Sequence, residues 1–180
     1  MSIKCIAVFC GSKPGKNPIF AQHASELGRI IAVRNLKLVY GGGKAGLMGI
    51  VADSVMAGGS PVLGIIPELL KEWETYHQGI TELRTVADMH VRKKMMYEHC
   101  DAAIFLPGGF GTLDELFEIL TWNQLKIHNK RIFIINSGDF YDHLIDHLRN
   151  LEKEGFLYDR LSDRITVCAS PGELEPYLLP

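Results

Sequence analysis

The stretch LPGGFGTLDELFE, residues 106–118, brings together residue types that could do chemistry on a ligand. A strand-like run ends at Pro107, three glycines follow, and Thr112 stands three residues before Glu115 in the expected first turn of a helix. That spacing is typical of the capping box, in which a hydroxyl and a carboxylate satisfy free backbone amides. It could equally place Glu115 beside a ligand, as a general base or a counter-charge to a cationic transition state. The spacing alone leaves both interpretations open.

A second group of candidates is the basic run RKK at 92–94, near the start of another predicted helix. Cations at that end oppose the helix dipole, so the sequence forgoes some stability there. A functional anion partner for Arg92 and Lys93 is one explanation, and a solvated helix face is the other. Asp114 and Glu118 have a simpler interpretation, as acids on a helix surface.

These candidates lie in a chain where apolar runs of strand length alternate with helical patterns. We predict strands over 3–10, 36–40, 61–67, 81–87, 102–107, 131–136 and 165–168. We predict helices over 19–34, 47–57, 89–100, 111–126, 140–154 and 171–179, and an irregular segment over 68–80. Alternation of this kind predicts an α/β fold: a single Rossmann-like domain over 1–180, with a doubly wound, mainly parallel sheet and helices on both faces. Ligands of such sheets bind outside the carboxyl ends of the strands.

Three strand-to-helix loops at that edge are unusual, at 10–15, 41–49 and 107–112. The second fits GxGxxG and is followed by Glu68 at the distance of a ribose-binding acid, which would argue for a dinucleotide. The fingerprint normally follows the first strand, however, and the chain leaves no room for a second domain. A P-loop fails because Leu47 stands where the lysine belongs. Glycine loops before helix N-termini still favour a bound phosphate. The alternative is that the glycines only make tight turns.

Composition narrows the classes of partner. The chain has 180 residues and a formal net charge of −2, which argues against nucleic acid. Its four cysteines form no CxxC pair, and no cluster of His, Cys and carboxylate residues has metal-ligand spacing. No apolar run approaches the roughly 20 residues that span a bilayer. We therefore expect a cytoplasmic protein without a membrane partner, a metal or a cofactor.

The motifs taken together are more specific than any one loop. DMHVRK at 88–93 and PGGFGTLDE at 107–115 resemble the LONELY GUY (LOG) family, whose hallmark is PGGxGTxxE. CGS at 10–12, VYGGG at 39–43, GLMG at 46–49, GIIP at 64–67 and TWNQL at 121–125 are also similar to that family, so the resemblance covers almost the whole chain. Such proteins are often labelled lysine decarboxylases, although no lysine here stands in a pyridoxal phosphate context.

The resemblance implies cytokinin riboside 5′-monophosphate phosphoribohydrolase activity, the cleavage of N6-modified AMP, and often AMP, into free base and ribose 5-phosphate. It implies a homodimer with the site near the interface. Glu115 and Arg92 match the family's catalytic residues. The matching substrate-binding positions are Lys93, Gly109, Phe110, Gly111, Thr112, Leu113, Asp114, Thr121 and Glu74, the last within a segment that departs from the usual pattern. We add Ser12, Gly42 and Gly43 from the other two loops as expected substrate contacts.

Two other functions remain in competition. Molybdenum-cofactor carriers resemble this fold and hold a nucleotide-like phosphate without hydrolysing it. A dinucleotide oxidoreductase would bind NAD. The presence of both Arg92 and Glu115 favours the hydrolase over the carrier.

Overall fold

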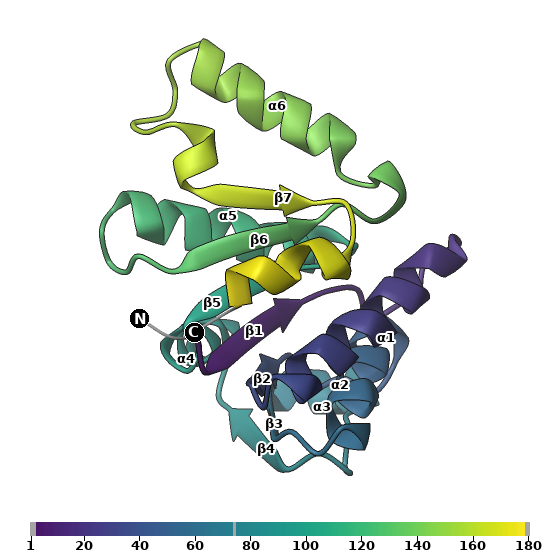
Figure 1. Cartoon of the computed structure of the whole chain (residues 1–180). Helices are drawn as coiled ribbons and strands as arrows, with labels where there is room; N and C mark the ends of the chain where they lie inside the picture. The colour runs from purple at the N-terminus through teal and green to yellow at the C-terminus, as the bar shows by residue number, and fades with distance from the viewer. Residues whose placement is uncertain (1–2, 74, 179–180) are drawn as a thin grey trace.

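The computed structural model describes residues 3–73 and 75–178, in which seven strands form one sheet (Figure 1). The strands are β1 (Cys5–Phe9), β2 (Lys37–Tyr40), β3 (Val62–Pro67), β4 (Glu82–Val86), β5 (Ala102–Phe105), β6 (Arg131–Ile135) and β7 (Ile165–Cys168). Their order across the sheet is β4-β3-β2-β1-β5-β6-β7, and each pair of neighbours is parallel. The predicted fold class is confirmed.

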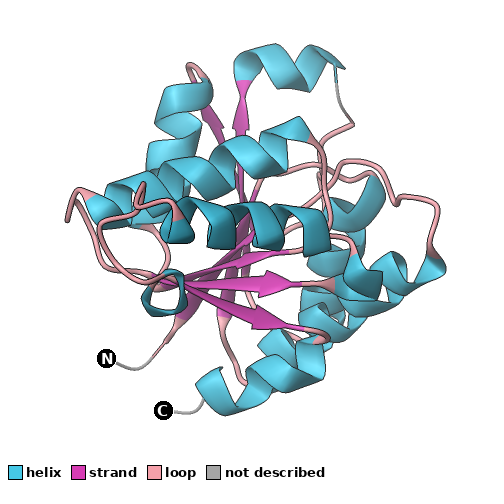
Figure 2. Cartoon of the chain, turned by 90° about the horizontal axis from the view of Figure 1, so that it is seen from above, coloured by secondary structure: helices cyan, strands magenta, loops and turns pink. Residues whose placement is uncertain are grey.

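Helices cover both faces of this sheet (Figure 2). The α-helices are α1 (Pro18–Val33), α2 (Gly46–Ala57), α3 (Glu68–Trp73), α4 (Met89–Glu98), α5 (Phe110–Gln124) and α6 (Asp142–Lys153). Short 3₁₀ helices are η1 (Ser137–Asp139), η2 (Leu161–Asp163) and η3 (Pro171–Leu178). No helix within the described residues combines the length and apolar character needed to cross a bilayer.

The core has one hydrophobic cluster on each face of the sheet. In β1, Ile6 and Val8 pack with α1 and α2, whereas Ala7 and Phe9 pack on the α4 and α5 side. Because both faces are covered, both sets of strand side chains must be apolar. This is why the central strands run without polar alternation, whereas the edge strand β4 carries Glu82 and Arg84 and is only partly buried.

Two segments differ from their predictions. The span 68–80 was expected to be irregular, but its first six residues form α3. The chain end was expected to be an ordinary helix, but η3 is a 3₁₀ helix with Pro176 inside it. Proline has no amide hydrogen and disfavours a continuous α-helix at that point.

The strand order reverses between β1 and β5, and this position determines where a ligand can bind. The chain leaves β1 toward α1 on one face and leaves β5 toward α5 on the other. The two connections diverge from a common point, where the Gly11 amide donates to the Pro107 carbonyl oxygen at 3.0 Å. A crevice at such a switch point is the usual ligand site of doubly wound sheets.

Candidate active site

The start of α5 lies at this switch point, and its cap differs from the expected one. Gly109 is the N-cap and no side chain caps the helix. Thr112 is therefore the third helical residue and Glu115 the sixth, so the capping box and the first-turn position of Glu115 were wrong. The glycine-rich turn begins the helix earlier than the spacing suggested. The amides of Phe110, Gly111 and Thr112 precede the first i→i−4 bond, from Leu113 to Gly109, and point out of the helix end.

Thr112 has a packing role in the turn. Its side chain is buried against Gly108, where an added Cβ would lie 2.1 Å from the threonine Oγ1. The same Cβ would lie 3.0 Å from the Gly11 amide nitrogen. Glycine at 108 is thus required for the loops after β1 and β5 to pack together.

Glu115 places a buried carboxyl group one turn below the free amides. Only 7% of the residue is exposed. Burial raises the pKa of Glu115 to about 7, although the nearby positive charge of Arg92 lowers it. A carboxyl group with a pKa near neutrality can give or take a proton at working pH. The Glu115 backbone oxygen accepts a 2.8 Å bond from the Tyr97 hydroxyl, which ties α5 to α4.

Arg92 is the fourth residue of α4 and is held by backbone carbonyls. Its Nε donates to the Ile65 oxygen at 3.0 Å and its Nη2 to the Gly41 oxygen at 3.1 Å. An added Cβ at Gly41 would lie 2.0 Å from Nη2, so the guanidinium needs glycine there. The remaining nitrogen, Nη1, lies 3.8 Å from Glu115 Oε1. The fixed cation thus faces the carboxyl group.

Lys93 is buried, so the basic run at 92–94 is not a solvated helix face along its whole length. Its ammonium group is buried between Asp114 Oδ2 at 3.0 Å and Glu118 Oε1 at 3.2 Å. Burial lowers the pKa of Lys93, but the hydrogen bonds to these two carboxylates outweigh that effect and the pKa lies above its ordinary value. Glu118 is mostly buried rather than on the surface, whereas Asp114 is largely exposed.

A cavity of about 250 Å³ joins these groups. Its lining includes seven of the predicted residues: Ser12, Arg92, Gly109, Phe110, Gly111, Thr112 and Glu115. Lys93 and Asp114 form the adjoining ion pair instead, and Thr121 hydrogen-bonds the Phe117 carbonyl oxygen on an exposed part of α5. Leu113 packs against the hydrophobic cluster beneath α5. Glu74 lies outside the described residues.

Gly42 and Gly43 are buried away from the cavity, and Gly41 lines it in their place. The Gly42 oxygen accepts the His77 amide at 2.9 Å, and Gly43 forms an antiparallel bridge with Tyr76. The glycine loop after β2 is thus occupied by the segment that follows α3, and its contacts are those of a tight structural turn.

Sequence patterns did not mark the apolar walls of the cavity. Val8, Phe9, Cys10, Met48, Leu70 and Met96 line it. Leu70 belongs to α3, which was not predicted. Met96 is fully buried in the core and also reaches the cavity. A second, more apolar cavity of about 300 Å³ adjoins at Gly11, Ser12 and Gly109, with Phe20 and Phe140 in its wall.

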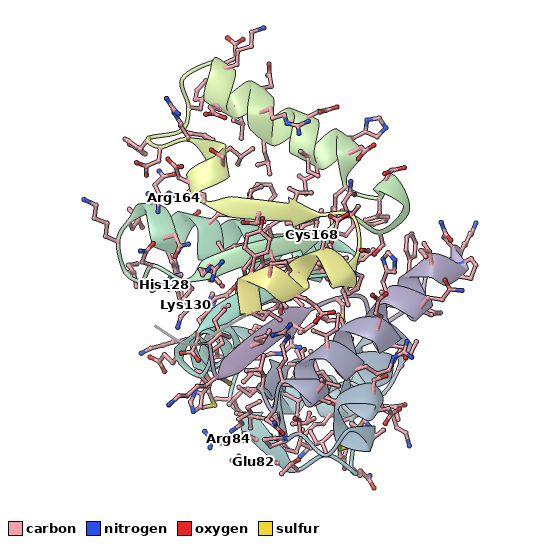
Figure 3. All side chains as sticks on the ribbon, viewed as in Figure 1. Glu82, Arg84, His128, Lys130, Arg164 and Cys168 are labelled. Atoms are coloured by element: carbon pink, nitrogen blue, oxygen red, sulfur yellow. The ribbon has the colours of Figure 1, made fainter. Side chains whose placement is uncertain are left out.

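Other polar clusters lie away from this edge. His128, Lys130 and Arg164 gather near the amino ends of β6 and β7, opposite the arrowhead end where Cys168 lies (Figure 3). His128 Nδ1 and the Lys130 amide both contact Asn123 Oδ1, which ties α5 to the start of β6. Among the residues that the structure describes, no group of His, Cys, Asp and Glu could hold a metal ion.

Comparison with known proteins shows which family this chain belongs to. The family described as "Possible lysine decarboxylase" matches residues 48–178. A cytokinin riboside 5′-monophosphate phosphoribohydrolase of Rhodococcoides fascians is 43% identical over 166 residues, which is 92% of this chain and 84% of that protein. The phosphoribohydrolase LOG3 of Arabidopsis thaliana is 44% identical over 169 residues, covering 94% and 79%.

Solved structures show the same fold at lower identity. The molybdenum cofactor binding protein from Rippkaea orientalis has a TM-score of 0.73 and 20% identity, covering 99% of this chain and 96% of that one. The Moco carrier protein from Chlamydomonas reinhardtii has a TM-score of 0.73 and 16% identity, covering 97% and 94%. At such identities the likeness concerns the fold alone.

Proposed function

We propose, from the premise that this chain belongs to the LONELY GUY (LOG) family of phosphoribohydrolases, that it hydrolyses the N-glycosidic bond of N6-modified adenosine 5′-monophosphate. AMP itself is a further expected substrate. The products are the free base and ribose 5-phosphate. The observation that carries the proposal is the buried pair of Glu115 and Arg92 in a cavity capped by the free amides of α5.

Each part of the nucleotide has a counterpart in the cavity. The amides of Phe110, Gly111 and Thr112, at a helix N-terminus, suit the 5′-phosphate. Glu115 lies one turn further along α5, so a phosphate held at the helix end presents its ribose to this carboxylate. Anchoring the phosphate restricts the sugar to productive orientations, which can contribute several kcal/mol to the rate.

The reaction exchanges one bond at C1′ for another. As the bond from C1′ to the base nitrogen breaks, positive charge develops on C1′ and the ribose ring oxygen, and the Glu115 carboxylate stabilises it. Water then bonds to C1′, and Glu115 accepts one of its protons. The departing base takes up a proton and leaves neutral. Arg92 positions the nucleotide and stabilises charge on the departing group.

The lysine decarboxylase description fits the site poorly. A Schiff-base lysine must lose its proton, and this requires a lowered pKa. Lys93 is the buried lysine beside the cavity, and its two carboxylate partners raise its pKa. Within residues 3–73 and 75–178, no lysine lines the cavity itself.

Replacing Glu115 tests the proposal. We expect Glu115→Gln to reduce base release from N6-isopentenyl-AMP by at least a thousandfold, because the neutral amide cannot stabilise the cation or accept the proton. Chromatography of free base and ribose 5-phosphate measures the loss, and calorimetry should show retained nucleotide binding. Glu152→Gln, on the exposed side of α6, is the matched control. Full activity of Glu115→Gln would remove the assigned role.

The same assay separates the hydrolase from a carrier. Wild-type protein that binds AMP and N6-isopentenyl-AMP but releases base from neither would be a carrier. The 42–46% identity to named phosphoribohydrolases favours hydrolysis, since the carriers match at 20% or less.

A homodimer and a cytoplasmic location complete the proposal. Phe110 is 92% exposed at the cavity mouth, and Phe117 on α5 and Val91 on α4 are also exposed. Apolar side chains beside a polar site suit a subunit interface. The location is favoured by the four cysteines, which are all free thiols, as is usual for proteins of the reducing cytosol.

A further inference from the structure

His77 and Asp53 form a side-chain pair outside the cavity that the proposed chemistry does not use. His77 follows α3 and is buried, and its Nε2 lies 2.8 Å from Asp53 Oδ1 on α2. Its Nδ1 lies 3.1 Å from the Gly79 amide nitrogen. Because an amide N–H can only donate, Nδ1 is the acceptor, and the hydrogen-bond pattern assigns the proton to Nε2, which donates to Asp53.

The His77 backbone holds the glycine loop after β2. Its amide donates to the Gly42 oxygen at 2.9 Å, and the Lys44 amide donates to the Thr75 oxygen at 2.8 Å. Residues 75–77 therefore run antiparallel to residues 42–44. The loop is held in place by residues 75–77, which lie more than thirty positions away in the chain. Asp53 in turn attaches that segment to α2.

The same loop holds Arg92. The Gly41 carbonyl oxygen, one residue before the His77 partner, accepts the 3.1 Å bond from Arg92 Nη2. The guanidinium lies directly on the Gly41 backbone, where even a Cβ would collide with it. A displacement of the 41–43 loop therefore moves or releases one of the two carbonyls that orient the guanidinium.

We propose that His77 and Asp53 are positioning residues for Arg92, acting through the 41–43 loop, an inference that rests on the proposed function. A purely structural role would appear mainly as lost stability. The His77 side chain is 5% exposed, but that of Asp53 is 62% exposed, so water can replace the Asp53 carboxylate as the acceptor for Nε2 and the loss of stability should be small. Catalysis is more sensitive, because small misplacements of a charged group cost large factors in rate.

Three variants test the pair. Asp53→Ala removes the acceptor, and His77→Phe keeps the ring but removes both nitrogens. Asp53→Asn keeps an oxygen that accepts from Nε2 and serves as the conservative rescue. Asp146→Ala, in an exposed pair with Arg149 on α6, is the matched control. We expect Asp53→Ala and His77→Phe to lower kcat for N6-isopentenyl-AMP tenfold or more, and Asp53→Asn to restore most of it. Urea-unfolding midpoints of Asp53→Ala and Asp53→Asn should match the control.

A double-variant cycle decides whether the effect passes through Arg92. In an Arg92→Ala background, Asp53→Ala should have no further effect on AMP affinity or on the remaining rate, because the positioned group is absent. An equal loss in both backgrounds, or wild-type kcat in Asp53→Ala, would overturn the inference. Absence of hydrolysis by wild-type protein would instead count against the proposed function. In that case the double-variant cycle, measured on AMP affinity, would still test the positioning role.

Discussion

At the scale of single residues, the burial that suits Glu115 to its proposed catalytic role also destabilises the folded protein. Burial of a carboxyl group disfavours its charged form, and here this raises the pKa of Glu115 from 4.5 to about 7. Between those pH values the folded protein holds a proton that the unfolded chain has released. Rising pH therefore favours the unfolded state across this window.

This difference predicts a pH-dependent effect of Glu115→Gln on stability. As the pH rises from 4.5 to 8, the free energy of unfolding of wild type should fall relative to that of the variant by up to about 3 kcal/mol, which is the free-energy equivalent of the pKa shift. The fall should level off above pH 7, where both states are ionised. Urea unfolding at several pH values measures it, with Glu152→Gln as control. A difference that stays constant with pH would show that Glu115 has an ordinary pKa.

Two sequence motifs together selected the pair of residues on which the proposed mechanism rests. DMHVRK and PGGFGTLDE together indicated Arg92 and Glu115, which the fold brings within 3.8 Å across two helices. The spacing of Thr112 and Glu115 alone was misleading, because a capping box requires a threonine at the N-cap and Gly109 occupies that position. The partners of Arg92 could not be predicted from the sequence, because they are backbone carbonyl oxygens, which every type of residue supplies.

At the scale of elements, the turn from β5 to α5 contains glycines of two kinds. Gly108 is packed against Thr112 and the Gly11 backbone. At Gly111 an added Cβ meets nothing within 4 Å, although the residue lines the cavity. The first glycine serves the packing of the loops, and the second leaves space beside the free amides.

Alanine at the two positions should separate these roles. We expect Gly108→Ala to lower the free energy of unfolding by about 1–3 kcal/mol, because its methyl group overpacks the turn. Gly111→Ala should leave stability unchanged or slightly higher, because alanine suits a helix better, yet raise KM severalfold by narrowing the phosphate space. Urea unfolding and steady-state kinetics measure the two effects. Equal stability losses would contradict the distinction.

The elements themselves were largely predictable from periodicity. All seven strands and five long helices lie where the apolar patterns placed them, because buried parallel strands and amphipathic helices differ clearly in pattern. Among the α-helices the exception is α3, which has six residues, too few for a helical period to stand out. Missing it also meant missing the contribution of Leu70 to the cavity.

At the scale of the whole molecule, the site belongs to the point where the strand order reverses. Alternating elements predicted a doubly wound sheet, but strand order depends on pairings that no local pattern encodes. Because β1 and β5 are neighbours in the sheet, CGS and PGGFGT lie side by side. The hydrogen bond between them joins two residues that are nearly a hundred positions apart in the chain.

The proposed assembly predicts an effect of charge on the exposed face of α5. Phe117→Asp should convert a dimer to a monomer and lower activity, because a carboxylate would be buried at the interface. Val33→Ser, on the exposed end of α1, should change neither property. Sedimentation equilibrium and the base-release assay measure both. A Phe117→Asp protein that remains dimeric would place the interface elsewhere.

The two carbonyl partners of Arg92 also bear on how this protein can vary over evolution. Any residue at position 65 supplies the same oxygen, so isoleucine there can drift among strand formers without disturbing the cation. Position 41 supplies an oxygen too, but its missing side chain is itself a requirement. Substitution within the core at position 65 should therefore leave its bond to the guanidinium in place, whereas any side chain at position 41 would displace the guanidinium from its observed position.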